Sequence, residues 1–257
     1  MSRLAYILLL AMLMSGCESL PNKATAQIDN RRVEYALSGN GGKTVVFENG
    51  LGGTMDWWAK VLPELGGNVT AFAYNRPGYG NSEPASTPRD GQHIAEELRL
   101  LLRAKHLPPP YILVGHSLGG LYMQLFARLH PDEVSALILV DSTHPEQLKG
   151  NGAYENRPLW VRMLFQLAMV TSDVTKQELR NAVLASPTFA GKPVLVLGAL
   201  QPLEQTSPLA DDSNAKRRDL VRLYPGAKQI WVDSGHGIPL DMPDSVVAAI
   251  GDASERH

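Results

Sequence analysis

Ser117 stands in the stretch GHSLG (115–119), which has the G-x-S-x-G spacing found around nucleophilic serines. The stretch follows an apolar run, YILV (111–114), and opens a segment with helical spacing, so a sharp strand-to-helix turn is expected at the serine. Glycines two places before and two places after Ser117 suit a turn with a crowded backbone. Free N–H groups at the helix start would favour developing negative charge. The pattern predicts a nucleophilic serine.

A serine hydroxyl needs a base that accepts its proton. Among the seven histidines, His236 is the strongest candidate, because it follows the predicted strand AKQIWV (227–232) and precedes the last predicted helix. His144 is the one rival, since it lies just beyond another predicted strand end. The other histidines stand beside Ser117, in or at the ends of predicted helices, or at the chain terminus: His116, His93, His106, His130 and His257.

The elements that must position these residues alternate along the chain. Short apolar runs are followed by segments with helical spacing, which predicts one α/β domain with a mainly parallel sheet and helices on both faces. The expected strands are 32–37 and 44–48, paired with each other across a glycine-rich turn, then 69–74, 111–115, 134–140, 193–197 and 227–232. The expected helices are 93–105, 118–129, 216–224 and 243–253.

The alternation stops between about 143 and 191. The loop-like stretch GNGAYENRP (150–158) is followed by Trp160, Met163, Leu164 and Leu167 at helical spacing. An insertion after the carboxyl end of a strand would lie over the edge where open α/β sheets bind ligands. We therefore expect a small helical lid over about 143–191. A helix pair packed on the flank of the sheet is the alternative interpretation.

The amino terminus has the pattern of a targeting segment. Residues 4–14 form an apolar run of eleven behind Arg3, too short for a membrane span, which needs about 20 residues. Ser15-Gly16-Cys17 follows, and Cys17 is the single cysteine of the chain. This arrangement resembles a bacterial lipoprotein signal peptide, which implies lipidation of Cys17 and cleavage before it. An ordinary signal peptide with an incidental cysteine is the alternative.

These features divide the chain into a signal peptide over 1–16, a polar tether over 17–27 and a folded domain over 28–257. We expect the mature protein to be lipid-anchored in the bacterial cell envelope. Glu18, in place of the Asp associated with inner-membrane retention, favours the outer membrane facing the periplasm.

Composition argues against several other functions. With 24 basic and 26 acidic residues the formal charge is −2, and without a basic run there is no electrostatic footprint for nucleic acid. No pair of histidines has the i, i+4 spacing of a metal site, and a G-x-G-x-x-G or phosphate-binding loop is absent from the sequence. We expect neither a metal nor a cofactor.

The chain resembles the α/β-hydrolase superfamily from about residue 28 to residue 253. Four motifs account for the resemblance: ENGLGG (48–53), NRPGYGNS (75–82), GHSLGG (115–120) and SGHG (234–237). It implies an oxyanion hole formed by the backbone N–H groups of Leu51 and Leu118. Asn49 and Asn75 depart from the usual His and Asp of this superfamily, which bears on substrate preference more than on catalysis.

The resemblance also bears on the acid of a catalytic triad. Most members place it after the strand that follows the lid, but here Gln201 or Pro202 occupies that position. A minority place it at the end of the preceding strand, where this chain has Asp141, giving the order Ser117, Asp141, His236. The acid would fix the imidazole tautomer and stabilise the imidazolium. Glu204, and after it Asp211 or Asp212, are the alternatives.

Two further positions are candidates for a role at the site. One of Trp57 and Trp58, which follow the first glycine loop, is a candidate substrate contact, with simple packing as the alternative. Arg76 is expected to brace a loop.

The sequence therefore predicts a serine hydrolase that cleaves small-molecule carboxylic esters through an acyl-enzyme with Ser117, His236 and Asp141. The same triad acting on another acyl or C–C bond, as in a peptidase, a lactonase or an acyltransferase, is the first alternative. A non-catalytic binding protein of the cell envelope is the second.

Overall fold

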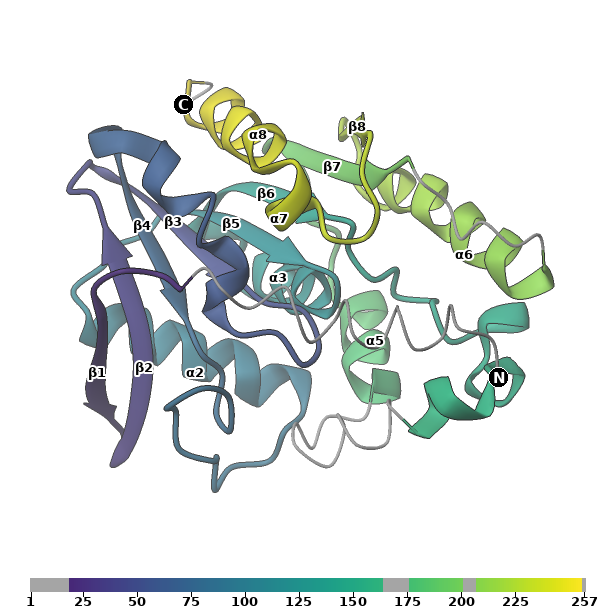
Figure 1. Cartoon of the computed structure of the whole chain (residues 1–257), viewed down its shortest axis with the longest axis horizontal. Coiled ribbons are helices and arrows are strands. Elements are labelled where there is room, and N and C mark those ends of the chain that lie inside the picture. The colour runs from purple at the N-terminus through teal and green to yellow at the C-terminus, as the bar shows by residue number, and fades with distance from the viewer. Residues whose placement is uncertain (1–18, 164–175, 201–206, 256–257) are drawn as a thin grey trace.

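The computed structural model describes residues 19–163, 176–200 and 207–255, which form an eight-stranded sheet in the order β1-β2-β4-β3-β5-β6-β7-β8 (Figure 1). The strands are β1 (Lys23–Ile28), β2 (Arg31–Ser38), β3 (Lys43–Glu48), β4 (Val69–Tyr74), β5 (Tyr111–His116), β6 (Val134–Val140), β7 (Val194–Ala199) and β8 (Lys228–Val232). Strands β3 to β8 pair in parallel, whereas β1 and β2 are antiparallel to their neighbours. The predicted, mainly parallel sheet is confirmed.

Helices cover both faces of this sheet. The α-helices are α2 (Gly91–Ala104), α3 (Leu118–Leu129), α5 (Lys176–Ala185), α6 (Pro208–Asp219), α7 (Ile238–Asp241) and α8 (Pro243–Glu255). The 3₁₀ helices are η1 (Met55–Trp58), η2 (Leu62–Asn68), η3 (Pro131–Glu133), η4 (Gly150–Gly152), η5 (Tyr154–Asn156) and η6 (Leu220–Leu223). Helix α8 lies over one face, and α2 and α3 lie over the other (Figure 1).

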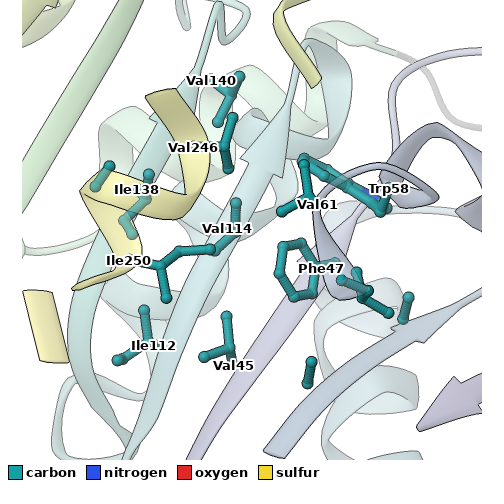
Figure 2. Packing of buried hydrophobic residues seen from close by; sticks show 14 of the residues in the cluster. Val45, Phe47, Trp58, Val61, Ile112, Val114, Ile138, Val140, Val246 and Ile250 are labelled. Carbon is teal, nitrogen blue, oxygen red and sulfur yellow. The ribbon is translucent and has the colours of Figure 1, made fainter. Parts of the chain in front are cut away.

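Alternating side chains on the central strands fill two cores. On β3, Val45 and Phe47 point toward α8 and η1, whereas Val46 points toward α2 and α3. Figure 2 shows the first core, in which side chains of β3, β5 and β6 pack against Val246 and Ile250 of α8 and against Trp58. Because these strands are apolar on both faces, their sequences read as continuous apolar runs.

Several predicted bounds agree with the structure, and β4, β6 and α3 match them residue for residue. The predicted pairing of 32–37 with 44–48 is wrong, because β4 lies between β2 and β3 and pairs with both. The helix predicted over 216–224 begins too late. Helix α6 begins at Pro208, where the Ser207 side chain accepts a hydrogen bond from Ala210 N, and ends at Asp219, and the 3₁₀ helix η6 follows it directly over Leu220–Leu223.

The folded domain begins before residue 28, so the predicted tether over 17–27 is too long. Residues 23–28 form β1, which pairs along its whole length with β2. Leu20 is buried in the first core, and its N–H donates to Asp56 Oδ1 over 2.9 Å. Lys23 Nζ lies 2.7 Å from the same carboxylate and ties the start of β1 to η1. The signal peptide and Cys17 lie outside the described residues.

The described part of the 143–191 insertion includes η4, η5, a helical stretch over 159–163 and α5. Helix α5 packs against α2 and α3, with Leu179 and Val183 fully buried beside Leu121. Residues 143–148 instead border the site described below. The idea that this insertion acts as a lid stays a prediction. Within the ranges that the structure describes, every helix is too short or too polar to cross a bilayer.

Candidate active site

Ser117 occupies a sharp turn between β5 and α3. Its backbone has φ 54° and ψ −122°, a left-handed conformation that is rare for a residue with a side chain. Three backbone hydrogen bonds hold the turn: Ser117 N donates to Val140 O, and Ser117 O accepts from Gly120 N and Thr143 N. The strain fits the predicted strand–turn–helix around a nucleophile.

The glycines around the serine allow this turn to form. A Cβ atom on Gly115 would lie 2.6 Å from Gly120 Cα, and one on Gly119 would lie 2.5 Å from the carbonyl oxygens of Glu48 and Asn49. No side chain fits at such distances from backbone atoms. The expected need for small residues at 115 and 119 is confirmed, and α3 can therefore approach the end of β3 closely.

The loop after β3 lies directly against the serine. A Cβ on Gly50 would be 3.1 Å from Ser117 Cβ, and Leu51 and Leu118 line the same pocket. Within the described residues, neither the Leu51 N–H nor the Leu118 N–H donates to a backbone carbonyl. Both groups are thus available as donors beside Ser117, as an oxyanion hole requires.

Arg76 braces this loop through its guanidinium, as expected. Its guanidinium is buried, forms an ion pair with Glu48, and donates to Asn49 O over 2.6 Å and to Gly50 O over 2.8 Å. The Tyr74 hydroxyl also donates to Glu48. A buried charge pair therefore fixes the backbone just before Leu51.

Asp141 and His236 are joined by a short hydrogen bond. His236 Nδ1 lies 2.5 Å from Asp141 Oδ2, and the Ala199 N–H donates to Asp141 Oδ1 over 3.2 Å. Only 1% of the Asp141 side chain is exposed, against 52% of the His236 side chain. Asp141 also has a left-handed backbone, with φ 38°. A buried carboxylate thus orients an accessible imidazole.

Arg217, from α6, also contacts the acid, with Nη2 3.0 Å from Asp141 Oδ2. Burial opposes ionisation of Asp141, but the hydrogen bond from His236 and the positive charge of Arg217 outweigh it and hold the pKa of this carboxyl below its ordinary value. Asp141 is therefore a carboxylate at neutral pH. Nothing in the sequence pattern pointed to Arg217.

Serine and base come to the same edge because β5, β6 and β8 run in parallel. Across the part of the chain that the structure describes, Ser117 Oγ makes no hydrogen bond with His236 or with any other residue. Such bonds are often long before substrate binds. The hydrogen bond between Asp141 and His236 is thus formed, whereas the Ser117 hydroxyl is not held by a hydrogen bond to the described residues.

The rival candidates are placed differently. His144 Nδ1 accepts from Glu146 N over 2.9 Å, and its Nε2 lies 3.4 Å from Asp219 Oδ2, so this histidine has its own partners. Asp212 pairs with Lys216 at 2.7 Å, and Asp211 stands in the first turn of the same helix. Glu204, Gln201 and Pro202 lie outside the described residues.

His116, which sequence reasoning set aside, contacts His236. Its Nε2–H donates to the carbonyl oxygen of His236 over 2.8 Å, and the two rings lie 4.7 Å apart. Burial, together with the charge of His236, lowers the pKa of His116 to about 3. His116 is thus a neutral platform that adds no second positive charge.

The two tryptophans have structural contacts. Trp58 is fully buried in the first core, and its Nε1–H donates to Asn49 Oδ1 over 2.7 Å, so the predicted substrate contact is wrong for this residue. Trp57 stacks on His116 at 4.9 Å and is not among the residues that line the pocket. Trp58 is therefore a core residue, and Trp57 packs on His116.

The two asparagines that depart from the superfamily pattern are buried as well. Asn49 Nδ2 donates to Tyr74 O, and Asn75 accepts from Met55 N over 2.8 Å and donates to Glu34 over 2.6 Å. Neither residue lines the pocket. Their side chains hold the glycine loops together. The expected effect on substrate preference is therefore not supported by a direct contact of either asparagine with the pocket.

A pocket of about 120 Å³, partly open to solvent, lies beside Ser117. Residues from the loop after β3, from α3, from the insertion and from α5 line it: Leu51, Ser117, Leu118, Leu121, Thr143, His144, Pro145, Gln147, Leu148, Arg157 and Arg180. The walls are mostly apolar, which suits an acyl or alcohol group. Among the described residues, no cluster of three or more His, Cys, Asp or Glu could hold a metal ion.

Comparison with known proteins adds independent findings. Residues 43–163 match the family model described as the alpha/beta hydrolase fold. The uncharacterised protein YqjL of Bacillus subtilis (strain 168) is 31% identical over 103 residues, which are 40% of this chain and 41% of that protein. The chain thus spans about two fifths of the length of the first curated relatives that it matches.

Two solved structures illustrate the fold. A membrane phospholipase A superimposes with a TM-score of 0.66 at 18% identity, covering 98% of this chain and 91% of that one. An enol-lactonase from Burkholderia xenovorans LB400 superimposes with a TM-score of 0.64 at 18% identity, covering 91% of this chain and 100% of that one. At these identities the likeness concerns the fold alone.

Proposed function

Because the chain has the α/β-hydrolase fold, we propose that it is a serine hydrolase that cleaves carboxylic esters through an acyl-enzyme intermediate. The observation that carries the proposal is the 2.5 Å contact between His236 Nδ1 and the buried Asp141, at the sheet edge where Ser117 occupies its strained turn. An imidazole held by a carboxylate in this way is a base prepared to activate a serine.

The proposed reaction has two halves. His236 Nε2 accepts the Ser117 proton as Oγ bonds to the ester carbonyl carbon, and an electron pair moves onto the carbonyl oxygen. The N–H groups of Leu51 and Leu118 donate to that oxyanion, each contributing about 2.7 to 4 kcal/mol to the transition state. The intermediate then expels the alcohol, which takes the proton from His236.

The second half uses water as the nucleophile. His236 removes a proton from water, the new bond forms at the acyl carbon, and collapse of the intermediate releases the carboxylic acid and Ser117. Asp141 stabilises the imidazolium in both halves, because its lowered pKa keeps it ionised. Arg76 contributes indirectly by holding the Asn49 and Gly50 carbonyls, and with them the Leu51 N–H.

The experiment measures hydrolysis of p-nitrophenyl esters, from acetate to palmitate, by the full-length chain in mild detergent and by its Ser117→Ala variant. We expect activity that Ser117→Ala abolishes, with a chain-length optimum that reports the size of the pocket. Labelling by a fluorophosphonate probe is expected on Ser117 alone.

Other results would point elsewhere. Labelling of Ser117 without ester turnover would favour another bond, as in a peptidase or an acyltransferase, and a lactone panel would test a lactonase, the activity named for one structural neighbour. A folded protein that neither turns over an ester nor reacts with the probe would contradict the proposal and favour a binding role.

We also propose that the protein is lipid-anchored through Cys17 in a bacterial cell envelope, with outer-membrane attachment preferred. The support is the sequence alone: an apolar run over 4–14 followed by the single cysteine. Cells fed a labelled fatty acid are expected to label the wild-type protein and not Cys17→Ala. Equal labelling of both would contradict the anchor and leave the hydrolase proposal untouched.

A further inference from the structure

Two arginines, Arg157 and Arg180, line the pocket beside Ser117, and neither takes part in the proposed ester chemistry. Among the described lining residues there is no Asp or Glu that could neutralise them. The remaining lining side chains are apolar or uncharged, apart from His144, whose pKa burial lowers. The pocket next to the nucleophile therefore has a positive wall.

Arg180 is the more unusual of the two. The residue is 3% exposed, and its Nε and Nη1 atoms are buried without a hydrogen-bond partner. Burying a charge without a partner is costly, and arginines buried to this extent are nearly always paired. A buried guanidinium with unused donors at the wall of a pocket indicates that the partner is an anion brought by a ligand.

Glu146, the acidic residue whose pKa Arg180 influences, forms no ion pair with Arg180. Glu146 is partly exposed and pairs with Lys149 at 2.7 Å. The hydrogen bond from Lys149, with a smaller contribution from Arg180, holds the pKa of Glu146 below its ordinary value. Within the described part of the chain, no carboxylate oxygen lies within ion-pair distance of Arg180.

Arg157 adds charge but is already engaged. Its Nε donates to Gly152 O over 3.3 Å and its Nη2 to Gln147 O over 3.4 Å. Burial lowers the pKa of Arg157, and Asp212 partly offsets this. Arg157 therefore strengthens the positive potential of the pocket. The Nε and Nη1 atoms of Arg180, in contrast, have no hydrogen-bond partner.

Arg180 is held in place by the packing of its helix. Leu179 and Val183 of α5 are fully buried against α2 and α3, on the same short helix as Arg180. Arg128 Nη1, from α3, donates to Val183 O over 3.1 Å and to Ser186 O over 3.2 Å. The guanidinium thus stands on a docked helix, which is how a preorganised binding group is built.

We propose that Arg180 is the anion-binding group of the substrate pocket, and that the substrates are esters whose acid or alcohol part bears a carboxylate. The inference rests on the proposed ester hydrolysis and adds the chemical class of the substrate. A carboxylate bound by Arg180 would provide the missing partner of the buried guanidinium. It would also hold the ester carbonyl beside Ser117, which lines the same pocket. A charge-assisted hydrogen bond of this kind changes affinity by about 10- to 100-fold.

The test compares esters matched in shape and different in charge. For the acid side the pair is mono-p-nitrophenyl adipate and p-nitrophenyl hexanoate. For the alcohol side it is 4-carboxyphenyl butyrate and 4-(methoxycarbonyl)phenyl butyrate. The ratio of kcat/KM for the charged ester to that for the neutral ester is measured in the wild type, Arg180→Gln, Arg180→Lys and Arg103→Gln. Arg103 is an exposed arginine at the end of α2, so its variant controls for net charge.

We expect Arg180→Gln to lower this ratio about 10- to 100-fold for at least one pair, because the charged ester loses much more activity than the neutral one. Arg180→Lys should recover part of the ratio, and Arg103→Gln should leave it unchanged. The pair that responds identifies which side of the ester bears the carboxylate. A ratio unchanged in both pairs, or an equal loss on charged and neutral esters, would overturn the inference while leaving ester hydrolysis in place.

A binding measurement separates the two proposals. Calorimetry is used to compare the binding of monomethyl adipate by Ser117→Ala and by Ser117→Ala/Arg180→Gln, neither of which needs to turn over substrate. We expect at least about tenfold weaker binding by the double variant. If no ester is hydrolysed but this difference is found, the anion site holds and the hydrolase proposal fails. Equal binding by both variants would contradict the anion site.

Discussion

Arg217 and His236 share one acceptor: Arg217 Nη2 and His236 Nδ1 lie 3.0 and 2.5 Å from the same carboxylate oxygen, Asp141 Oδ2. A cation from α6 therefore contacts the acid that orients the proposed base. The carboxylate is almost fully buried, so its ionisation depends on these two partners. The arrangement links helix α6 to the chemistry at the edge of the sheet.

Asp141→Asn tests the identity of the acid. The amide cannot fix the imidazole tautomer or stabilise the imidazolium, so kcat/KM for p-nitrophenyl butyrate should fall by about three to four orders of magnitude. The matched control is Glu204→Gln, which should stay close to the wild type. A large loss in Glu204→Gln together with a small loss in Asp141→Asn would move the acid to Glu204.

Arg217→Met tests the shared acceptor. The positive charge of Arg217 helps to hold the pKa of Asp141 below its ordinary value, and its guanidinium donates to the same oxygen that orients His236. Without it the buried carboxylate loses a charge-assisted partner, so kcat/KM for p-nitrophenyl butyrate at pH 7 should fall about tenfold or more. Arg222→Met is the control, because Arg222 is exposed on η6 and does not contact Asp141. Equal kcat/KM in wild type and Arg217→Met would argue against this role.

His116 makes stability depend on pH. Its pKa falls from an ordinary 6.5 to about 3 in the folded state because it is buried, next to His236. Between these two values the unfolded chain binds a proton that the folded chain does not. The contribution of His116 to the free energy of unfolding is therefore fully present above pH 6.5. It declines as the pH falls toward 3, and the loss is about 2 kcal/mol at pH 5.

The measurement is urea unfolding at pH 7 and pH 5, for the wild type and His116→Gln. Glutamine keeps an N–H donor and cannot titrate, so the loss of stability between the two pH values should be about 2 kcal/mol smaller in the variant. Contributions from other groups cancel in this comparison. The same loss in both proteins would show that His116 is protonated in the folded state near pH 5.

The placement of Ser117, Asp141 and His236 at one edge of the sheet could be predicted because each follows a strand that is recognisable as a short apolar run. The carboxyl ends of β5, β6 and β8 meet at one edge, so residues far apart in sequence come together there. The order of the first strands could not be predicted in this way. A glycine-rich turn suggests a hairpin, whereas the insertion of β4 between β2 and β3 depends on pairing across distant residues.

The side chains that surround Ser117, Asp141 and His236 depend on packing that the local sequence does not encode. Trp57 and Trp58 are identical neighbours, but successive residues of the 3₁₀ helix η1 point about 120° apart, so one enters the core and the other stacks on His116. Arg180 and Arg217 lie on helices whose position on the sheet decides what they contact. Neither residue belongs to a motif with a recognisable spacing.

Arg76→Met tests the contacts of Arg76 with the loop after β3. The substitution leaves Glu48 fully buried without its ion partner, which should lower the free energy of unfolding by about 3 to 5 kcal/mol. It also removes the donors to Asn49 O and Gly50 O, so kcat should fall. Urea unfolding of Arg76→Met/Glu48→Gln should show part of the stability restored, because the unpaired charge is gone. A double variant as unstable as the single one would mean that charge burial is not the cause.

Gly119→Ala tests the close contact between α3 and the end of β3. In an open helix position this change usually stabilises a protein by about 0.4 to 1 kcal/mol, as expected for Gly251→Ala in α8, where a new Cβ meets nothing within 4 Å. At Gly119 the new Cβ would lie 2.5 Å from the Asn49 and Glu48 carbonyl oxygens, and backbone cannot yield as a side chain would. We therefore expect a loss of roughly 1 to 3 kcal/mol in urea unfolding, with lower kcat as the Leu51 N–H moves away from Ser117. If Gly119→Ala were as stable and as active as Gly251→Ala, helix and loop would have to be further apart than the structure places them.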